Sequence, residues 1–223
     1  MSGQVGDRHA TLTFADVESL VDLSTYVGRA RAYDTGGAIR LQAVGAVLAA
    51  WVCVLPGRDL VGSGTVLGLR TMPLAGEHRL DATVPLSGLT DRFARRGVTA
   101  DTSTVLTVPP TTVSPPWGGV TPPRSGWAPV GQLGSAALLE AARRGVAEVA
   151  EGTPGSAGAP AVAALRARVW GRLLDHDVPA GAGLAALALG FAREGGQHSL
   201  VATVHRAGPW TRVSLPAGHI LCR

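Results

Sequence analysis

The sequence predicts an α+β protein of two related modules, each an antiparallel sheet with helices on one face, and two observations support this prediction. Segments rich in β-branched residues alternate with segments of helical periodicity, and several sequence blocks occur twice in the same order. A repeated unit of roughly 100 residues indicates two modules related by a pseudo-two-fold axis. We expect the first module over residues 1–128 and a second, shortened module over residues 129–223.

Four pairs of matching blocks carry the repeat. In chain order they are LDATVP (80–85) with LDHDVP (174–179), FARRG (93–97) with FAREG (191–195), STVLTV (103–108) with SLVATV (199–204), and PWGGVTPP (116–123) with PWTRVSLP (209–216). Because the order is the same in both halves, the similarity favours duplication of an ancestral unit over coincidence.

The first module is predicted to begin with a helix over residues 14–32, which carries Leu20, Leu23 and Val27 on one side and ends before a Gly-Gly pair. Beyond it, a stretch rich in β-branched residues breaks at Gly45, and this break favours a hairpin. The expected strands cover residues 39–44, 47–55, 64–74, 79–84 and 104–108, and the second expected helix covers residues 87–96.

A segment rich in proline and tryptophan follows. Residues 109–129 hold seven of the fifteen prolines together with Trp117 and Trp127. Such a stretch cannot form a helix and is typical of a linker or of an extended edge region. Because Trp117 matches Trp210 in the repeat, we expect a strand over residues 117–120.

The second module is predicted to open with a helix over residues 135–151. Residues 161–170 are ambiguous, because their apolar side chains have helical spacing whereas the nearby arginines alternate as in a strand. The match of VAALR (162–166) to the more strand-like VLGLR (66–70) favours a strand. The closing elements are expected to be a helix over residues 182–193 and strands over residues 199–205, 210–215 and 218–222.

Composition and charge predict a cytoplasmic protein without membrane contact. Cys53 and Cys222 are the only cysteines, so a disulfide scaffold is not indicated and a reducing compartment is expected. The longest apolar runs, residues 43–55 and 182–192, are shorter than a membrane span, and the first fifteen residues lack the features of a secretion signal. The formal net charge of +4 allows an acidic partner without defining a site.

Two local patterns suggest ligand sites, and a simpler explanation is available for each. GAGLAA (181–186) fits a loose dinucleotide fingerprint but lacks a βαβ context, so small residues that let a helix pack closely explain it better, and we expect no cofactor. His198, His205, His219 and Cys222 crowd the C-terminal region. Residues three or seven apart on a regular strand point to opposite faces, so we also expect no metal site there.

Asp175, His176 and Asp177 form the one cluster with acid/base character. Histidine is the usual general base, so a catalytic role for His176 beside the two aspartates is one interpretation. The matching position of the first module keeps only Asp81, however, which favours a structural role for Asp81 and Asp175 near a strand end.

The arginines on the predicted helices are the other candidate functional group. Arg92, Arg95 and Arg96 share one helix face, and further arginines lie near the ends of other helices. This second group consists of Arg29, Arg31, Arg143 and Arg144. Together they could form an electropositive surface that contacts phosphates without reading bases. A solvated helix face is the alternative.

The order of elements resembles a domain of the DNA sliding clamps, the processivity-factor family. The segments IRLQAVGAVLAAWVCVL (39–55) and ATVPLSGLTDRFARRG (82–97) are similar in pattern to the corresponding clamp segments. The resemblance implies paired βαβββ units with Arg29, Arg31, Arg92, Arg95, Arg96, Arg143 and Arg144 on helices that face DNA.

These observations lead to two functional hypotheses from different classes. The sequence carries no catalytic signature, so we expect a non-catalytic binding or assembly protein. Its partner would be nucleic acid or another protein, and it could form a homo-oligomer. The alternative is an enzyme of unknown reaction, with a site at the interface of the modules near His176.

Overall fold

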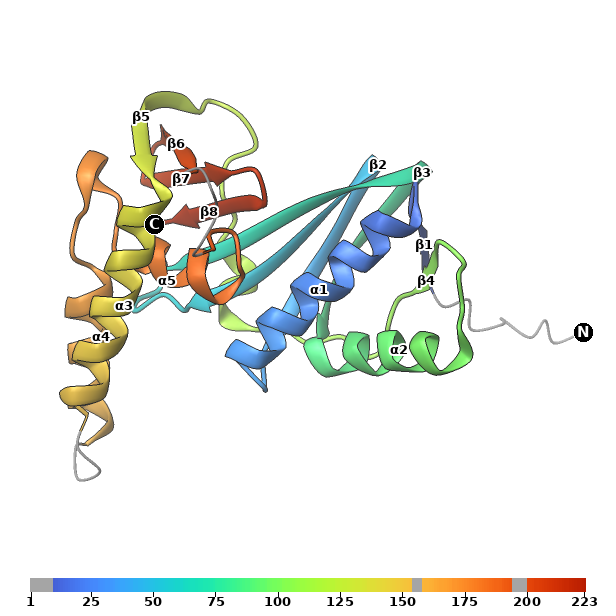
Figure 1. Ribbon diagram of the computed structural model, residues 1–223, viewed down its shortest axis with the longest axis horizontal. Coiled ribbons are helices and arrows are strands. Elements are labelled where there is room, and N and C mark those ends of the chain that lie inside the picture. Colours follow the sequence, from blue (N-terminus) through green and yellow to red (C-terminus); the bar gives the residue numbers. More distant parts are fainter. Residues whose placement is uncertain (1–9, 154–157, 194–199) are drawn as a thin grey trace, which may run out of the picture. The chain divides into compact units, whose positions relative to one another are not determined.

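The structure is a computed structural model and describes residues 10–153, 158–193 and 200–223 (Figure 1). Eight strands and five α-helices occur within these residues, and the α+β prediction is confirmed. The chain divides into two compact units, a first unit of residues 1–50 with 71–114 and a second unit of residues 51–70 with 115–223.

The first unit combines a two-stranded sheet, two helices and parts of two long strands. Strands β1 and β4 pair antiparallel, with Leu12 opposite Leu106, and helices α1 and α2 pack against each other. The elements are β1 (Thr11–Thr13), α1 (Val17–Tyr33), β2 (Ala38–Leu55), β3 (Val66–Pro85), α2 (Leu86–Thr99) and β4 (Val105–Thr107). Strands β2 and β3 also contribute residues to the second unit.

Helix α1 forms where its sequence provides both a cap and an apolar stripe. The carboxylate of Asp16 accepts a hydrogen bond of 2.6 Å from the backbone N–H of Ser19, which satisfies one of the free N–H groups at the start of the helix. The side chain of Ser19 also bonds the Asp16 carboxylate, and these hydrogen bonds lower the pKa of Asp16. The buried residues of the helix, among them Leu23 and Val27, lie on one side at helical spacing.

The hairpin expected at Gly45 is wrong, because β2 runs through this residue without turning. Odd-numbered residues are buried before Gly45 and even-numbered residues after it. Such a shift by one residue, with Gly45 at φ +62°, is typical of a β-bulge. A two-residue type I′ turn needs positive φ at two neighbouring residues, and Ala46 has a negative φ. The two strands expected over residues 64–74 and 79–84 likewise form one strand, β3.

The second unit is built on an antiparallel sheet with strand order β2-β3-β8-β7-β6-β5. Its own elements are η1 (Pro116–Gly119), β5 (Ala128–Gly134), α3 (Ser135–Glu151), α4 (Ala159–Trp170), η2 (Asp175–Asp177), α5 (Gly181–Ala188), β6 (Val201–Ala207), β7 (Trp210–Leu215) and β8 (Gly218–Cys222). The bounds of α3, β7 and β8 confirm the prediction, and the predicted start of β6 at residue 199 lies outside the described residues.

The two faces of this sheet are covered differently. On one face α5 contacts β8, and Val66 and Gly68 of β3 lie beside Cys222 and Ile220 of β8. The other face carries a cluster of Leu67, Trp210 and Leu221. The indoles of Trp117 and Trp127 and the side chain of Val120 pack against that cluster, so the proline-rich segment is a cover for the sheet.

Residues 117–120 do not form the expected strand. Pro116–Gly119 is a 3-10 turn, in which the backbone N–H of Gly118 donates to the carbonyl oxygen of Pro115 at 2.9 Å. The prolines at positions 115 and 116 have no N–H to donate to a neighbouring strand, which accounts for the difference. The position that matches Trp117, Trp210, lies in strand β7.

Residues 161–170 form helix α4, and the strand predicted there is wrong. The helical spacing of the apolar side chains was the correct signal. Pro160 lies in the first turn of the helix, where no intrahelical hydrogen bond needs its missing N–H. The apparent alternation of arginines has another cause, because Arg168 and Arg172 both bind Glu148 of α3. These ion pairs tie α4 to α3 and lower the pKa of Glu148.

Two of the four pairs of matched blocks adopt different structures, whereas STVLTV and SLVATV both contribute to a strand, β4 and β6. LDATVP lies in strand β3, whereas LDHDVP contains the 3-10 turn η2. The block FAREG extends beyond the described residues at positions 194 and 195. The duplication and a division into two modules at residue 128 stay predictions.

Helices α3 and α5 approach each other closely because small residues line their contact. A Cβ atom at Gly183 would overlap the carbonyl oxygen of Leu138 in α3. A Cβ atom at Gly181 would lie 2.8 Å from Cδ1 of Leu55 in β2. The glycines of GAGLAA thus let α5 pack closely on α3 and on the sheet.

We expect Gly183→Ala to lower the free energy of unfolding by about 1–3 kcal/mol, because the added methyl group forces α3 and α5 apart. The matched control is Gly97→Ala in α2, where a Cβ atom meets nothing within 4 Å. Alanine should stabilise that helix by about 0.5–1 kcal/mol. Urea denaturation measures both changes, and equal effects of the two substitutions would contradict the packing argument.

Candidate functional site

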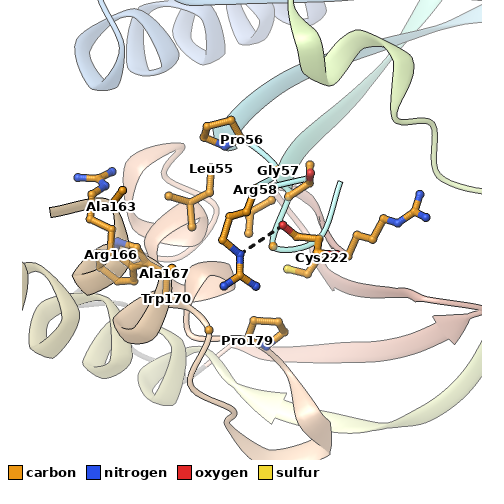
Figure 2. A pocket seen from close by; sticks show the side chains of 16 residues that line it. Leu55, Pro56, Gly57, Arg58, Ala163, Arg166, Ala167, Trp170, Pro179 and Cys222 are labelled. Carbon is orange, nitrogen blue, oxygen red and sulfur yellow. Dashed lines mark hydrogen bonds between the residues drawn. The ribbon is translucent and has the colours of Figure 1, made fainter. Parts of the chain in front are cut away.

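A cavity of about 660 Å³ lies within the second unit. Its walls come from the loop that joins β2 to β3, from one side of α4, and from residues at the end of β8 (Figure 2). The lining residues are Leu55, Pro56, Gly57, Arg58, Ser63, Gly64, Thr65, Val66, Ala163, Arg166, Ala167, Trp170, Gly171, Pro179, Cys222 and Arg223. Cavities of this size hold small organic ligands in many proteins.

The loop from Pro56 to Thr65 is held closed by its own hydrogen bonds. The carboxylate of Asp59 accepts from the backbone N–H of Ser63 at 2.9 Å, and the N–H of Arg58 donates to the carbonyl oxygen of Ser63 at 3.0 Å. Hydrogen bonds from Ser63 lower the pKa of Asp59. Gly62 and Gly64 both have φ near +80°, which a residue with a side chain rarely adopts.

The loop places the guanidinium of Arg58 inside the cavity. A Cβ atom at Gly64 would lie 2.9 Å from Nε of Arg58, so the arginine packs directly on the glycine backbone. Figure 2 shows the Arg58 guanidinium among Trp170, Pro179 and Cys222. Its Nε lies 3.5 Å from the carbonyl oxygen of Ser63, a weak contact. In the part of the chain that the structure describes, no carboxylate pairs with Arg58.

The charged side chains that face the cavity are arginines. Arg166 reaches it from α4, and none of the described lining residues is an aspartate or a glutamate. Arg223 lines it at the end of β8, but its guanidinium lies over the ring of Trp210, 5.8 Å from the centroid, on the opposite face of the sheet. A cleft lined by charge of one sign concentrates ions of the opposite sign.

The rest of the lining is apolar or neutral. Leu55 and Val66 are buried, and burial raises the pKa of Cys222 to about 12, so its thiol carries no charge at neutral pH. Thr65 Oγ1 and Trp170 Nε1 are buried and have no hydrogen-bond partner among the residues described. The cavity therefore combines guanidinium groups with an apolar wall.

This arrangement suits the binding of an organic anion. Guanidinium groups form charge-assisted hydrogen bonds with carboxylate and phosphate oxygens, and apolar walls bind the body of a ligand. The lining residues that the structure describes include no histidine or carboxylate that could act as a general base.

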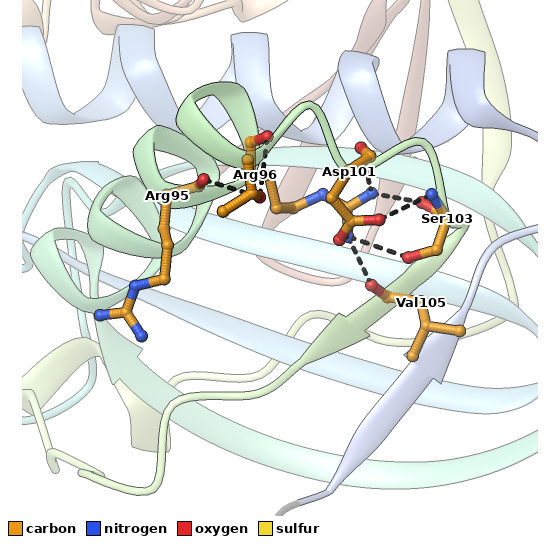
Figure 3. Close-up of polar contacts among 6 residues, drawn as sticks. Arg95, Arg96, Asp101, Ser103 and Val105 are labelled. Atoms are coloured by element: carbon orange, nitrogen blue, oxygen red, sulfur yellow. Dashed lines mark hydrogen bonds and ion pairs between the residues drawn. The ribbon is translucent and has the colours of Figure 1, made fainter.

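The arginines predicted from the sequence lie elsewhere, and Arg96 has an internal role (Figure 3). Its Nη1 donates to the carboxylate of Asp101 at 2.7 Å and to the carbonyl oxygen of Val105 at 2.8 Å. The Arg96 side chain thus fastens the loop after α2 to strand β4. Hydrogen bonds from Ser103, followed by the charge of Arg96, lower the pKa of Asp101.

The other predicted arginines do not gather in one unit. Arg29 and Arg31 are half-buried near the end of α1, and Arg92 donates to the carbonyl oxygen of Gly88 at 3.0 Å. Arg95 is exposed and points away from the loop that Arg96 fastens (Figure 3). In the second unit, Arg143 and Arg144 both form ion pairs with the carboxylate of Glu140, at N···O distances of 3.5 and 3.4 Å. Contact of all seven with DNA stays a prediction.

His176 is exposed and lies outside the lining of the cavity. Its Nε2 is 3.1 Å from the carbonyl oxygen of Gln132 and must carry a proton to donate to it. The ring lies directly over Gly131, where a Cβ atom would be 2.6 Å from Nδ1. Arg206 binds both the carbonyl oxygen of His176 and the carboxylate of Asp177. These contacts fasten η2 to β5 and β6, and Asp175 is exposed beside them.

Asp81, the counterpart of Asp175 in the repeat, has a structural contact. Its carboxylate accepts two hydrogen bonds of 2.7 Å from Arg40 and one of 3.1 Å from Gln42. This bidentate pair joins β3 to β2 in the first unit. Asp81 therefore acts in strand pairing.

The histidines near the C-terminal strands lie apart from Cys222. His219 Nδ1 is 2.9 Å from the hydroxyl of Ser214, on the sheet face opposite to the one that carries Cys222. His205 faces Arg212 on β7, and its buried Nδ1 has no partner among the described residues. His198 lies outside the described residues.

Sequence reasoning missed the cavity for two reasons. Gly62 and Gly64 are a usable signal of a tight loop that holds Arg58, and no site was predicted from them. The strand predicted over residues 161–170 also gave Arg166 the wrong position. In the structure, helix α4 carries this residue to the cavity.

We expect acid to destabilise the second unit through His219. Burial, followed by the charges of Arg212 and His205, lowers the pKa of His219. The stabilisation is then complete above the unfolded pKa of about 6.5 and declines as the pH falls from there toward the folded pKa. Urea denaturation between pH 7.5 and pH 5 measures this decline.

His219→Gln should reduce the decline, because it removes the buried imidazole. Equal pH dependence in the parent protein and His219→Gln would contradict the assignment.

Comparison with known proteins gives the chain a family. No curated protein matches the chain. Within the described residues, no helix has the length and apolarity needed to cross a membrane. Residues 122–223, which hold most of the second unit, match the family described as Domain of unknown function (DUF8185). Residues 8–119 match a second family over half of the chain, and the protein accordingly belongs to the family described as Domain of unknown function (DUF8010).

Proposed function

We propose that the protein is a non-catalytic binding protein that takes up a small organic anion in the cavity around Arg58. The observation that carries the proposal is a guanidinium without a carboxylate partner in the described residues, held on Gly64 inside a largely apolar cavity. Arg166, exposed on α4, adds charge of the same sign. An anion bound there would pair with Arg58.

The chemistry of the lining supports binding over catalysis. General acid/base catalysis needs a group that titrates near the working pH, and the described lining offers arginines, hydroxyl groups and a thiol. The Cys222 thiol, with a pKa of about 12, is a poor nucleophile at neutral pH. His176 does not line this cavity, so a role for it in catalysis would require a different site.

The clamp-like, nucleic-acid-binding role is a less supported proposal. Arg96 is engaged in the loop after α2, and Arg143 and Arg144 pair with Glu140. Arg95 is exposed. Steep salt dependence of binding to duplex DNA, reduced in Arg95→Ala, would favour that role over uptake of a small anion.

The test uses 8-anilinonaphthalene-1-sulfonate, a fluorescent probe with one anionic group on an aromatic body. We expect saturable binding to the parent protein and at least tenfold weaker binding to Arg58→Gln, because a hydrogen bond to a charged group contributes about 1.5–3 kcal/mol. The matched control is Arg144→Gln, which removes the same charge from the surface of α3 and should bind the probe normally.

Circular dichroism establishes that both variants fold. Equal affinity of the parent protein and Arg58→Gln for the probe would overturn the proposal, because the anion would then bind elsewhere.

A further inference from the structure

We infer that two copies of the chain associate through strand β2, which pairs antiparallel with β2 of the second copy over residues 41–50. The inference concerns the first unit, which contains these residues, and it does not depend on anion binding in the cavity. It uses three properties of the segment: its place at an edge of the sheet, its lack of charge and proline, and the shift of its burial pattern at Gly45.

Strand β2 lies at one edge of the six-stranded sheet, and β3 is its only strand neighbour among the described residues. Within the same described ranges, no backbone hydrogen bond joins residues 41–50 to a loop. The side chains of Val44 and Val47 are 60% and 50% exposed. An edge strand presents a row of N–H and C=O groups that can pair with another chain. This segment therefore offers a partner both backbone groups and apolar side chains.

The opposite edge of the sheet is protected against such pairing. Strand β5 contains Pro129, and its pairing with β6 shifts between Pro129 and Gly131. His176 also bonds the carbonyl oxygen of Gln132 in this strand. Prolines, bulges and covering segments are features by which proteins prevent association at sheet edges. Residues 41–50, LQAVGAVLAA, contain neither a proline nor a charged residue, so pairing there brings no charges together.

The bulge at Gly45 determines which partner fits this edge. Leu41 and Ala43 are buried before it, and Leu48 and Ala50 are buried after it. Residues that lie opposite each other in an antiparallel pair place their side chains on the same face of the sheet. A regular partner strand keeps one alternation along its length and can match only one half of the segment. A second copy carries the same shift and matches both halves.

The register of the pair follows from the same alternation. A two-fold axis between residues 45 and 46 places residues 41–44 of one copy opposite residues 47–50 of the other. Buried residues then lie opposite buried residues, and the two bulges meet at the axis. On the outer face Val44 lies opposite Val47, and cross-strand pairs of β-branched side chains stabilise a sheet.

Sedimentation velocity over a dilution series tests the association. We expect the parent protein to reach twice the chain mass of 22.7 kDa at high concentration and to dissociate on dilution. Val44→Lys and Val47→Lys should each weaken the dimer by about tenfold or more, because the added ammonium group opposes pairing at the edge. The matched control is Val21→Lys, at a valine of α1 that is 57% exposed, and it should dimerise as the parent does.

Mixtures of charged variants test the register. Val44→Lys mixed with Val47→Glu should form a heterodimer, because the two introduced charges lie opposite each other in the proposed pair. Val44→Lys mixed with Val44→Glu should associate more weakly, because each introduced charge then faces a valine. The reverse order of the two mixtures would overturn the register and the argument from the bulge.

Circular dichroism establishes that each variant folds, as expected for substitutions at exposed valines. A parent protein that stays monomeric at every concentration would overturn the inference. A dimer that both Val44→Lys and Val47→Lys leave intact would do the same, because the contact would then lie on another surface.

Discussion

The second unit depends on the pairing of strand β3 with strand β8. Val66, Leu67, Gly68 and Leu69 lie opposite Cys222, Leu221, Ile220 and His219, and thus join segments some 150 residues apart. Two further hydrogen bonds extend the pairing into the loop, from Gly64 to Arg223 and from Arg223 to Thr65. This pairing brings the loop that carries Arg58 beside the end of β8. Without it the cavity would lack two of its walls.

Local sequence patterns predicted those elements whose form is set by their own residues. Helix α3 and strands β7 and β8 have the expected bounds, because helical spacing and β-branched alternation act within each segment. The strands wrongly predicted over residues 117–120 and 161–170 arose where the matched blocks overrode local signals. Helix α4 had the correct apolar spacing, and Gly45 was correctly singled out, but a bulge and a turn both use a glycine with positive φ.

The candidate site was less predictable than the fold. Counting arginines on helices selects residues such as Arg96, whose partners Asp101 and Val105 are revealed only by the path of the loop after α2. Arg58 stands alone in sequence, and its importance comes from residues that approach it from α4 and β8. A sequence shows which charges exist, whereas their neutralisation depends on contacts between distant segments.

Burial of Cys222 has a consequence for the chemical durability of the protein. Only the thiolate is readily oxidised or alkylated, and burial raises the pKa of Cys222 to about 12, so the thiol is uncharged at neutral pH. Peroxide and electrophiles should therefore spare the floor of the cavity for as long as the chain stays folded.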